Sequence, residues 1–193
     1  MRLTSRRVAV FLLLVLLSVG FGFAFDGIAT AVEKSRYPRP AAYREQIARA
    51  AEAAGIPEAA VLALVRAESG FEGGGQDADG GVGLLRLTPE QLRVICEDYL
   101  QESVPDAGLL YDPETNLRVG CAYLSALYGR YGMWESVFAA WYAGVETVDG
   151  WIVDPDCLNA QGKLTKIPDS AVAKQVAAVI KAQNQYTELY YQG

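Results

Sequence analysis

Glu68 is the residue in this sequence whose setting most clearly suggests chemistry. Val61, Leu64 and Val65 precede it by seven, four and three positions, a spacing that places all four side chains on one face of a helix. An apolar helix face is normally buried, whereas a glutamate is rarely buried without a partner. The pattern therefore leaves two alternatives: a carboxyl group at the edge of the core, or a helix-terminal glutamate that extends its charge into water.

A buried Glu68 would be suited to general acid catalysis. Burial disfavours the charged form of a carboxyl group, and the partial negative charge at the C-terminal end of a helix disfavours it further. A carboxyl group that stays protonated can give its proton to the leaving oxygen of a glycosidic bond. Standard glycosidases also need a second carboxylate, and the candidates on the following glycine-rich loop are Glu72, Asp77 and Asp79. Each of these three acids is equally typical of a solvated loop.

The chain contains no histidine, which narrows the chemistry open to it. This absence excludes Ser-His-Asp and Cys-His nucleophilic machinery and the usual zinc-hydrolase sites. The three cysteines are Cys96, Cys121 and Cys157, and no two of them have the spacing of a C-x-x-C ligand pair. The sequence permits one disulfide without requiring it. Cys96 and Cys121 fit small positions in the core. Any catalysis must therefore use carboxylates, Lys, Tyr or Cys, with carboxylates as the main option, and we expect no metal and no cofactor.

The charge of the chain is unevenly distributed. The first 25 residues contain three arginines and no acid, which leaves 14 basic against 23 acidic residues, a net charge of −9, from Asp26 onward. An acidic domain without a basic stripe argues against nucleic acid as a partner.

The N-terminal segment has the pattern of a membrane signal. Residues 1–7 are short and basic, and residues 8–25 carry no charge; as a helix this run would span about 27 Å, close to the hydrocarbon thickness of a bilayer. We predict a cytoplasmic N-terminus at 1–7 and a single-pass transmembrane signal-anchor at 8–25, with the domain on the extracytoplasmic side of the cell membrane. A cleavable signal peptide is the alternative, with residues 29–31 (Ala-Thr-Ala) as a small-x-small site; the domain would then be secreted.

The rest of the chain predicts an all-α domain after a linker. Residues 26–40, which include two prolines, are the linker, and residues 41–193 are the domain. Gly55 and Gly132 are helix stops, and Thr88 with Gln91 forms a capping box. No useful run of alternating polar and apolar residues suggests a strand. We expect about seven helices, the clearest at 41–54, 57–68, 88–100, 112–131, 134–143 and 168–190.

Several short motifs, in this order and spacing, resemble the lytic transglycosylase SLT domain, the goose-lysozyme-like type of glycoside hydrolase family 23. The likeness covers roughly residues 43–190 and extends to small membrane-anchored forms from Gram-positive bacteria. The motifs are Glu68-Ser69-Gly70-Phe71, the run Gly83–Pro89, Asp112-Pro113-x-x-Asn116, Gly120-x-x-Tyr123-Leu124, Ala140-Trp141-Tyr142-Ala143-Gly144, and Ile167-Pro168 before a final helix.

The resemblance implies a lysozyme-like helical fold and a peptidoglycan-cleaving mechanism. Glu68 would protonate the oxygen between N-acetylmuramic acid and N-acetylglucosamine, and the acetamido group of the sugar would assist. Glu68 would then act as a base toward the C6 hydroxyl, giving a 1,6-anhydro end. The implied partners are peptidoglycan glycan strands and proteins of the cell-wall machinery. The implied substrate-binding residues are Ser69, Leu85, Arg86, Trp141, Tyr142 and Gln175.

The sequence departs from the family at several cleft positions. Arg86 stands where the family usually has Gln, Tyr142 where it has Asn, and Asp77 where it has Ser; Ala171, Val172 and Gln175 replace a Glu-Thr pair and a Tyr. An Arg86–Glu68 ion pair would lower the pKa of the acid. Two alternatives follow: a catalytically impaired glycan-binding or scaffold protein, and a lysozyme-type hydrolase in which Asp77 or Asp79 positions a water.

Overall fold

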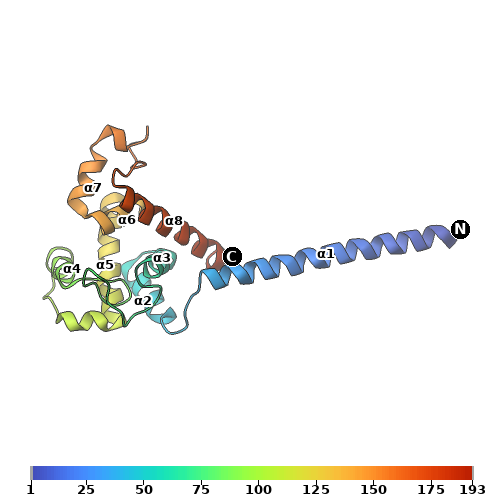
Figure 1. The fold of residues 1–193 in the computed structure, drawn as a ribbon, viewed down its shortest axis with the longest axis horizontal. Coiled ribbons are helices and arrows are strands. Elements are labelled where there is room, and N and C mark those ends of the chain that lie inside the picture. Colours follow the sequence, from blue (N-terminus) through green and yellow to red (C-terminus); the bar gives the residue numbers. More distant parts are fainter. Residues whose placement is uncertain (1, 193) are drawn as a thin grey trace. The chain divides into compact units, whose positions relative to one another are not determined.

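The structure is a computed structural model that describes residues 2–192, with side chains described from residue 9 onward except at 14 and 19–26. It is helical, and the described residues form only isolated β-bridges and no strand (Figure 1). The chain divides into two compact units, Met1–Pro38 with Gln192, and Arg39–Tyr191. The prediction of an all-α domain is confirmed.

The first unit is the helix α1 (Arg2–Arg36). This helix runs through most of the predicted linker, so only residues 37–40 of that linker lack helical structure. Among the residues that the structure describes, no helix is both long enough and apolar enough to cross a membrane. The predicted transmembrane signal-anchor is therefore not supported, and the side chains at 8, 14 and 19–25 of that run lie outside the described residues.

The second unit holds the other helices, and most of the predicted boundaries are confirmed. Gly55 and Gly132 adopt left-handed backbone conformations (φ 66° each) at the ends of their helices. The last helix begins at Ser170, two residues later than predicted, because Asp169 is its N-cap and accepts hydrogen bonds from two backbone N–H groups. The helices are α2 (Arg44–Ala54), α3 (Glu58–Ser69), α4 (Pro89–Val94), the π-helix η1 (Ile95–Leu100), the 3₁₀ helix η2 (Ala107–Tyr111), α5 (Pro113–Tyr131), α6 (Trp134–Ala143), α7 (Val145–Ile152), the 3₁₀ helix η3 (Pro155–Cys157) and α8 (Ser170–Tyr190).

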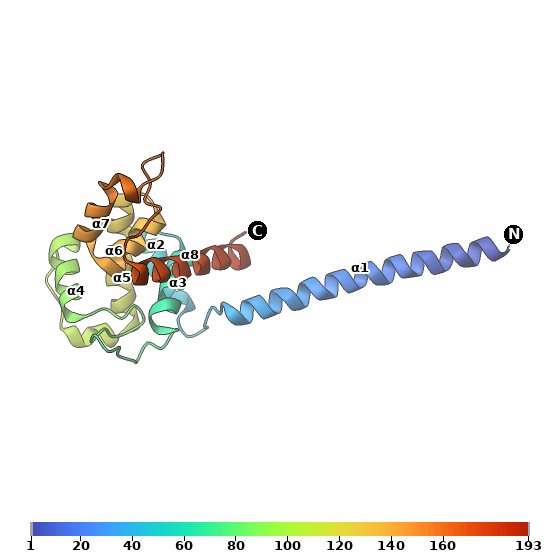
Figure 2. The same cartoon turned by 45° about the horizontal axis from the view of Figure 1, so that its top comes forward.

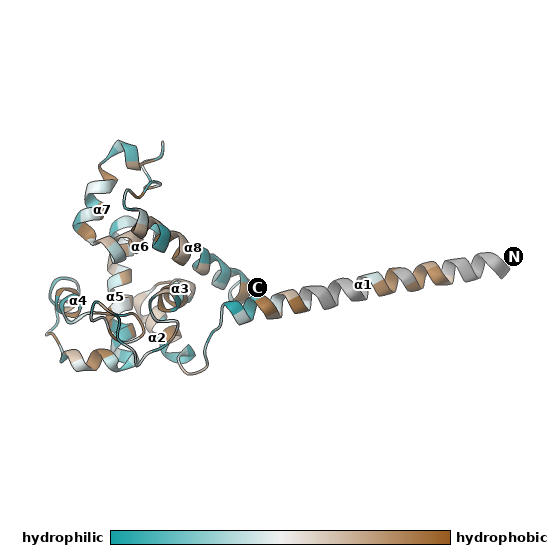
Figure 3. Ribbon diagram, in the orientation of Figure 1, coloured by the Kyte–Doolittle hydropathy of each residue, from teal (hydrophilic) through white to brown (hydrophobic). Residues whose placement is uncertain are grey.

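Helix α3 forms the centre of this unit. Every residue from Ala59 to Val65 is buried, because α3 packs against both α2 and α8, while α6 packs against α5 and α8 (Figure 2). Hydrophilic and hydrophobic residues alternate along α8 (Figure 3), and its buried side chains begin at Val172 and end at Tyr186. Burial of so many apolar side chains is the main source of stability here, and it fixes the end of α3, where Glu68 lies.

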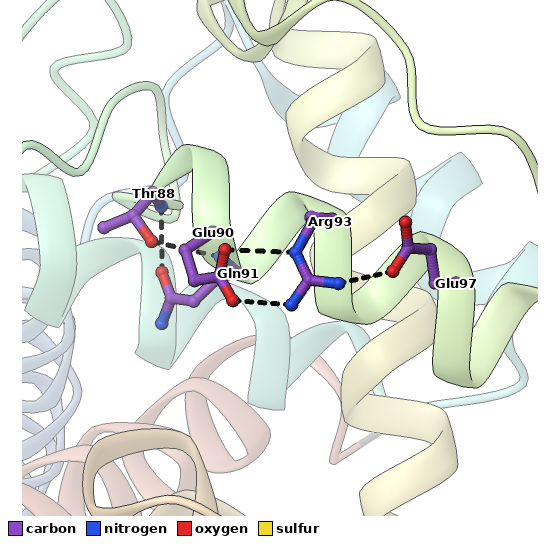
Figure 4. A network of polar contacts seen from close by, with 5 residues as sticks. All are labelled: Thr88, Glu90, Gln91, Arg93 and Glu97. Atoms are coloured by element: carbon purple, nitrogen blue, oxygen red, sulfur yellow. Dashed lines mark hydrogen bonds and ion pairs between the residues drawn. The ribbon is translucent and has the colours of Figure 1, made fainter.

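The predicted capping box at the start of α4 is present. The Thr88 hydroxyl accepts a hydrogen bond from the Gln91 N–H (3.1 Å), and the Gln91 side chain accepts one from the Thr88 N–H (2.8 Å). One turn later, Arg93 binds both Glu90 and Glu97 (Figure 4). These exposed ion pairs contribute little each, but they join α4 to η1 on the surface.

Asn116 holds the glycine-rich loop, residues 70–88, against α5. Its buried side chain accepts a hydrogen bond from the Leu85 N–H (2.8 Å) and donates to the carbonyl oxygens of Val82 (2.9 Å) and Leu110 (3.0 Å). A Cβ on Gly83 (φ 79°) would lie 2.3 Å from the Asn116 Nδ2 atom, so only glycine permits this close approach. The Asn116 amide thus fixes residues 82–85 of the loop against α5.

Replacement of Asn116 by alanine should destabilise the domain strongly. The substitution leaves one buried N–H group and two buried carbonyl groups without these partners, and we expect a loss of about 3 kcal/mol, or a melting temperature lower by roughly 6–12 °C. Arg118→Ala on the same helix is the control, because its ion pair with Glu102 is half exposed on both sides and should cost under about 1 kcal/mol. Equal losses in the two variants, measured by thermal unfolding, would contradict the role given to Asn116.

Candidate active site

Glu68 lies in a cleft of about 590 Å³ formed by α3, the glycine-rich loop, the start of α4, the end of α6 and one face of α8. Five of the predicted site residues line it: Glu68, Arg86, Trp141, Tyr142 and Gln175. The remaining lining residues are Ala63, Arg66, Ala67, Asp77, Asp79, Thr88, Gln91, Ala178 and Ala182.

Two of the predicted substrate-binding residues have other surroundings. Ser69 ends α3: its hydroxyl donates to the Val65 carbonyl (3.1 Å) and accepts from the Phe71 N–H (3.2 Å). Leu85 is fully buried, and a Cβ on Gly120 would lie only 2.3 Å from its Cδ1 atom. Neither residue is among those that line the cleft, so the structure assigns them to helix termination and core packing.

The environment of Glu68 favours the protonated acid. Burial is the largest influence and raises its pKa, while hydrogen bonds from the side chains of Tyr142 and Trp141 act in the opposite direction. The negative charge of Asp77 raises the pKa further. The Oε1 atom of Glu68 is buried with no hydrogen-bond partner among the described residues. Such an atom is costly as part of an ion, and as part of a neutral carboxyl group it is ready to interact with a ligand.

The Arg86 side chain binds the loop rather than Glu68. Its Nη1 atom donates to the carbonyl oxygens of Gly83 (2.9 Å) and Gly75, and the described residues contain no ion pair between Arg86 and Glu68. The Arg86–Glu68 ion pair that the sequence left open is therefore not formed among the described residues. The charge of Arg86 does lower the pKa of Glu68, but it is the weakest of the influences on that group.

The end of α6 brings two aromatic side chains to Glu68. Trp141 is only 8% exposed, and its ring lies 5.8 Å from that of Tyr123 between centroids. Burial, followed by the charge of Glu68, raises the pKa of Tyr142, which keeps its hydroxyl neutral and able to donate. Tyr142 is thus a hydrogen-bond partner of Glu68, a role that the sequence alone did not predict.

Sequence reasoning also missed part of the opposite wall. Ala178 and Ala182 follow Gln175 by three and seven positions, which places the three residues on one face of α8, and all three line the cleft. Small side chains at this spacing were the available signal for a wall with room for a ligand. Ala171 and Val172, the other positions that depart from the family pattern, are not among the lining residues; Val172 is buried.

Within the described part of the chain, no group of three or more His, Cys, Asp or Glu side chains is placed to hold a metal ion. All three cysteines are free and buried, so the disulfide left open by the sequence is not formed. The chemistry that the cleft offers comes from a half-buried carboxyl group with a raised pKa, beside hydrogen-bond donors and the charged side chains of Arg66, Asp77, Asp79 and Arg86.

Comparison with protein families matches residues 45–160 to the transglycosylase SLT domain. The soluble lytic murein transglycosylase of Escherichia coli K12 is 29% identical over 115 residues, which are 58% of this chain and 18% of that protein. The membrane-bound lytic murein transglycosylase C of Edwardsiella ictaluri is 26% identical over 110 residues, 56% of this chain and 31% of that protein. This chain therefore spans less than a third of the length of these two relatives.

Solved structures with the same fold include the 70 kDa soluble lytic transglycosylase of E. coli, with a TM-score of 0.73 and 24% identity over 83% of this chain and 26% of that one. An inactive mutant of the lytic transglycosylase Slt from Pseudomonas aeruginosa gives a TM-score of 0.69 at 24% identity, over 80% and 25% of the two chains. The complex of the 70 kDa enzyme with bulgecin A gives 0.72 at 25% identity, over 83% and 26%.

Replacement of Tyr142 by phenylalanine should raise the pKa of Glu68 further. The phenol hydroxyl stabilises the carboxylate by hydrogen bonding, so its removal disfavours the charged form. Carbon-13 NMR titration of the glutamate carboxyl groups, with Glu68→Gln to assign the signal, measures the midpoint. Tyr128→Phe is the control, because Tyr128 stacks on Trp134 and is not among the cleft-lining residues. A midpoint that falls or stays constant in Tyr142→Phe would exclude this hydrogen bond.

Glu68→Gln should also stabilise the protein at alkaline pH. The pKa of Glu68 in the folded chain is raised above its ordinary value. Its contribution to the free energy of unfolding is therefore fully present below the unfolded pKa, about 4.3. This contribution is lost as the pH rises through the folded pKa, because the folded chain then has to hold a buried charge. The neutral variant escapes this loss. The melting temperature of Glu68→Gln should therefore exceed that of the wild-type chain most at pH 8, and this difference should become smaller toward pH 4. A gap that widens on acidification would reverse the sign assigned to Glu68.

Proposed function

This chain belongs to the transglycosylase SLT domain family, and from that premise we propose that it is a lytic transglycosylase of peptidoglycan. The reaction is cleavage of the β-1,4 bond between N-acetylmuramic acid and N-acetylglucosamine. Glu68 acts first as the general acid and then as the general base. No cofactor takes part in the proposed reaction.

In the first step, the Glu68 carboxyl group gives its proton to the glycosidic oxygen. The bond between C1 of the muramic acid and that oxygen breaks, and its electron pair stays on the oxygen, which leaves as the hydroxyl of N-acetylglucosamine. The acetamido oxygen of the muramic acid bonds to C1 in its place, so a cyclic oxazolinium ion balances the new carboxylate. A second protein carboxylate is not needed for this step.

In the second step, the ionised Glu68 takes the proton of the C6 hydroxyl of the same sugar. The C6 oxygen bonds to C1, the bond from the acetamido oxygen breaks, and the amide is restored. Glu68 is protonated again, and the product carries a 1,6-anhydro end. Water is not consumed, so the net reaction is an intramolecular transfer.

The observation that carries this proposal is the state of Glu68. Its pKa is raised, and its Oε1 atom is buried without a hydrogen-bond partner among the described residues; both features favour the protonated form that a general acid requires. Gln175, Ala178 and Ala182 leave space on the opposite side of the cleft for a sugar ring. Arg86, whose pairing with Glu68 was the physical argument for an impaired protein, is engaged with the loop backbone instead.

The proposed substrate also sets the location. Peptidoglycan lies outside the cytoplasm, so the domain has to be on the extracytoplasmic side, and this remains part of the proposal. The relatives are described both as soluble and as membrane-bound transglycosylases. Retention by an N-terminal anchor and association with cell-wall proteins stay predictions of the sequence.

A lysozyme-type hydrolase is the second candidate. The observation that favours it is that Asp77 and Asp79 line the same cleft as Glu68, so either carboxylate is a candidate to activate a water. The two reactions leave different products. A hydrolase adds water and leaves a reducing end, whereas a transglycosylase leaves an anhydro end.

Incubation with purified peptidoglycan, followed by mass spectrometry of the released fragments, tests the proposal. We expect fragments with 1,6-anhydro ends from the wild-type chain and a loss of at least about 100-fold in Glu68→Gln, because the general acid is gone. Glu72→Gln is the matched control, since Glu72 is an exposed acid of the glycine-rich loop that follows α3 and is not among the cleft-lining residues.

Three outcomes would count against this function. Undiminished release by Glu68→Gln would remove Glu68 from the reaction. Fragments with reducing ends would support the hydrolase. Binding of glycan strands without any release would support the impaired glycan-binding protein.

A further inference from the structure

Asp77 lies on the wall of the cleft that contains Glu68, and its side chain is hydrogen-bonded to the backbone of the loop. Its Oδ1 atom accepts hydrogen bonds from the backbone N–H groups of Gly81 (2.7 Å) and Asp79 (3.0 Å), and its own N–H donates to the Gly81 carbonyl (2.9 Å). The two hydrogen bonds to Oδ1 join the Asp77 carboxylate to the backbone of the loop. The loop therefore presents a fixed negative charge to the cleft.

The surrounding backbone leaves the Asp77 side chain little freedom. A Cβ on Gly81 would lie 2.7 Å from the Asp77 Oδ2 atom and 2.3 Å from the Arg86 carbonyl oxygen, so the chain passes this point only as glycine. Arg86 fastens the same loop from inside through the carbonyl groups of Gly75 and Gly83. The position of the Asp77 carboxylate is thus set by the loop as a whole.

We propose that Asp77 is a positioning residue for the proposed reaction: its fixed carboxylate holds the proton on Glu68 until the glycosidic oxygen takes it. The inference rests on the proposed function and goes beyond it, because the family usually has an uncharged Ser at this position. Asp77 itself exchanges no proton and forms no bond. Its effect is electrostatic, since a second negative charge in the cleft disfavours ionisation of Glu68.

The other groups that face the cleft do not supply this effect. α8 contributes Gln175, Ala178 and Ala182, and α4 with its cap contributes Thr88 and Gln91, none of which titrates. Tyr142 of α6 has a raised pKa and stays neutral. The charged groups that remain along the described walls are Arg66 of α3 and Asp79 and Arg86 of the loop.

Asp77 and Arg86 are the two charged groups that shift the pKa of Glu68, and they oppose each other. The negative charge of Asp77 is the stronger influence of the two and raises the pKa, whereas the positive charge of Arg86 lowers it. Without Asp77 the guanidinium would act alone, and Glu68 would lose its proton at lower pH. The sequence thus carries a basic substitution at 86 together with an acidic one at 77 that outweighs it.

The isosteric variant Asp77→Asn tests the inference, because its side-chain oxygen can still accept both backbone hydrogen bonds. We expect the alkaline limb of the pH profile of kcat/KM to move to lower pH, with kcat in that limb reduced about fivefold and KM nearly unchanged. The carbon-13 titration midpoint of the Glu68 carboxyl group should fall in the same direction. Asp77→Ser, which can keep a turn of the same kind, should behave alike and serves if Asp77→Asn does not fold.

Glu72→Gln is the matched control, since it removes one negative charge from the same loop away from the cleft and should leave the pH profile in place. A uniform loss of activity at all pH values in Asp77→Asn, with an unchanged Glu68 midpoint, would overturn the inference. The same shift in Glu72→Gln would overturn it too, because net charge would then be the cause. If the wild-type chain releases no glycan fragments, the proposed function fails, while the NMR midpoint still decides the role of Asp77.

Discussion

The cleft depends on a single buried amide. Asn116 takes one hydrogen bond from the loop and gives two to backbone carbonyls of the loop and η2, and these contacts set the path of residues 82–85. Arg86 follows directly and fastens the loop to Gly75. The loop is held at both points, the Asp77 side chain is hydrogen-bonded to its backbone, and Asp77 lines the same cleft as Glu68, whose helix is held by the apolar packing of α3.

The electrostatic state of Glu68 follows from this arrangement as a balance of opposing effects. Burial and the charge of Asp77 raise its pKa, and hydrogen bonds from Tyr142 and Trp141 with the charge of Arg86 lower it. The net result is a raised pKa, which costs stability when the group ionises. A site that stabilised the carboxylate fully would make a more stable protein with a poorer acid, and the proposed general-acid role of Glu68 requires this loss of stability.

Much of the fold could be predicted from the sequence, because local signals act locally. The capping box at Thr88, the glycine stops and the apolar spacing before Glu68 correspond directly to observed features. The site was harder to predict. Leu85 and Ser69 belong to the family motifs, which suggested that they line the cleft. In the structure, Leu85 packs against Gly120 and Ser69 hydrogen-bonds to the backbone at the end of α3. The orientation of the Arg86 guanidinium depends on carbonyl groups whose positions come from long-range contacts with Asn116, which spacing along the chain does not encode.

The most direct test of the account is digestion of peptidoglycan by the wild-type chain in water enriched in heavy oxygen. If Glu68 passes its proton to the leaving sugar and the C6 hydroxyl closes the ring, the new ends are anhydro sugars that contain no heavy oxygen. Incorporation of heavy oxygen at the new ends would show that water is the nucleophile and would contradict the intramolecular transfer.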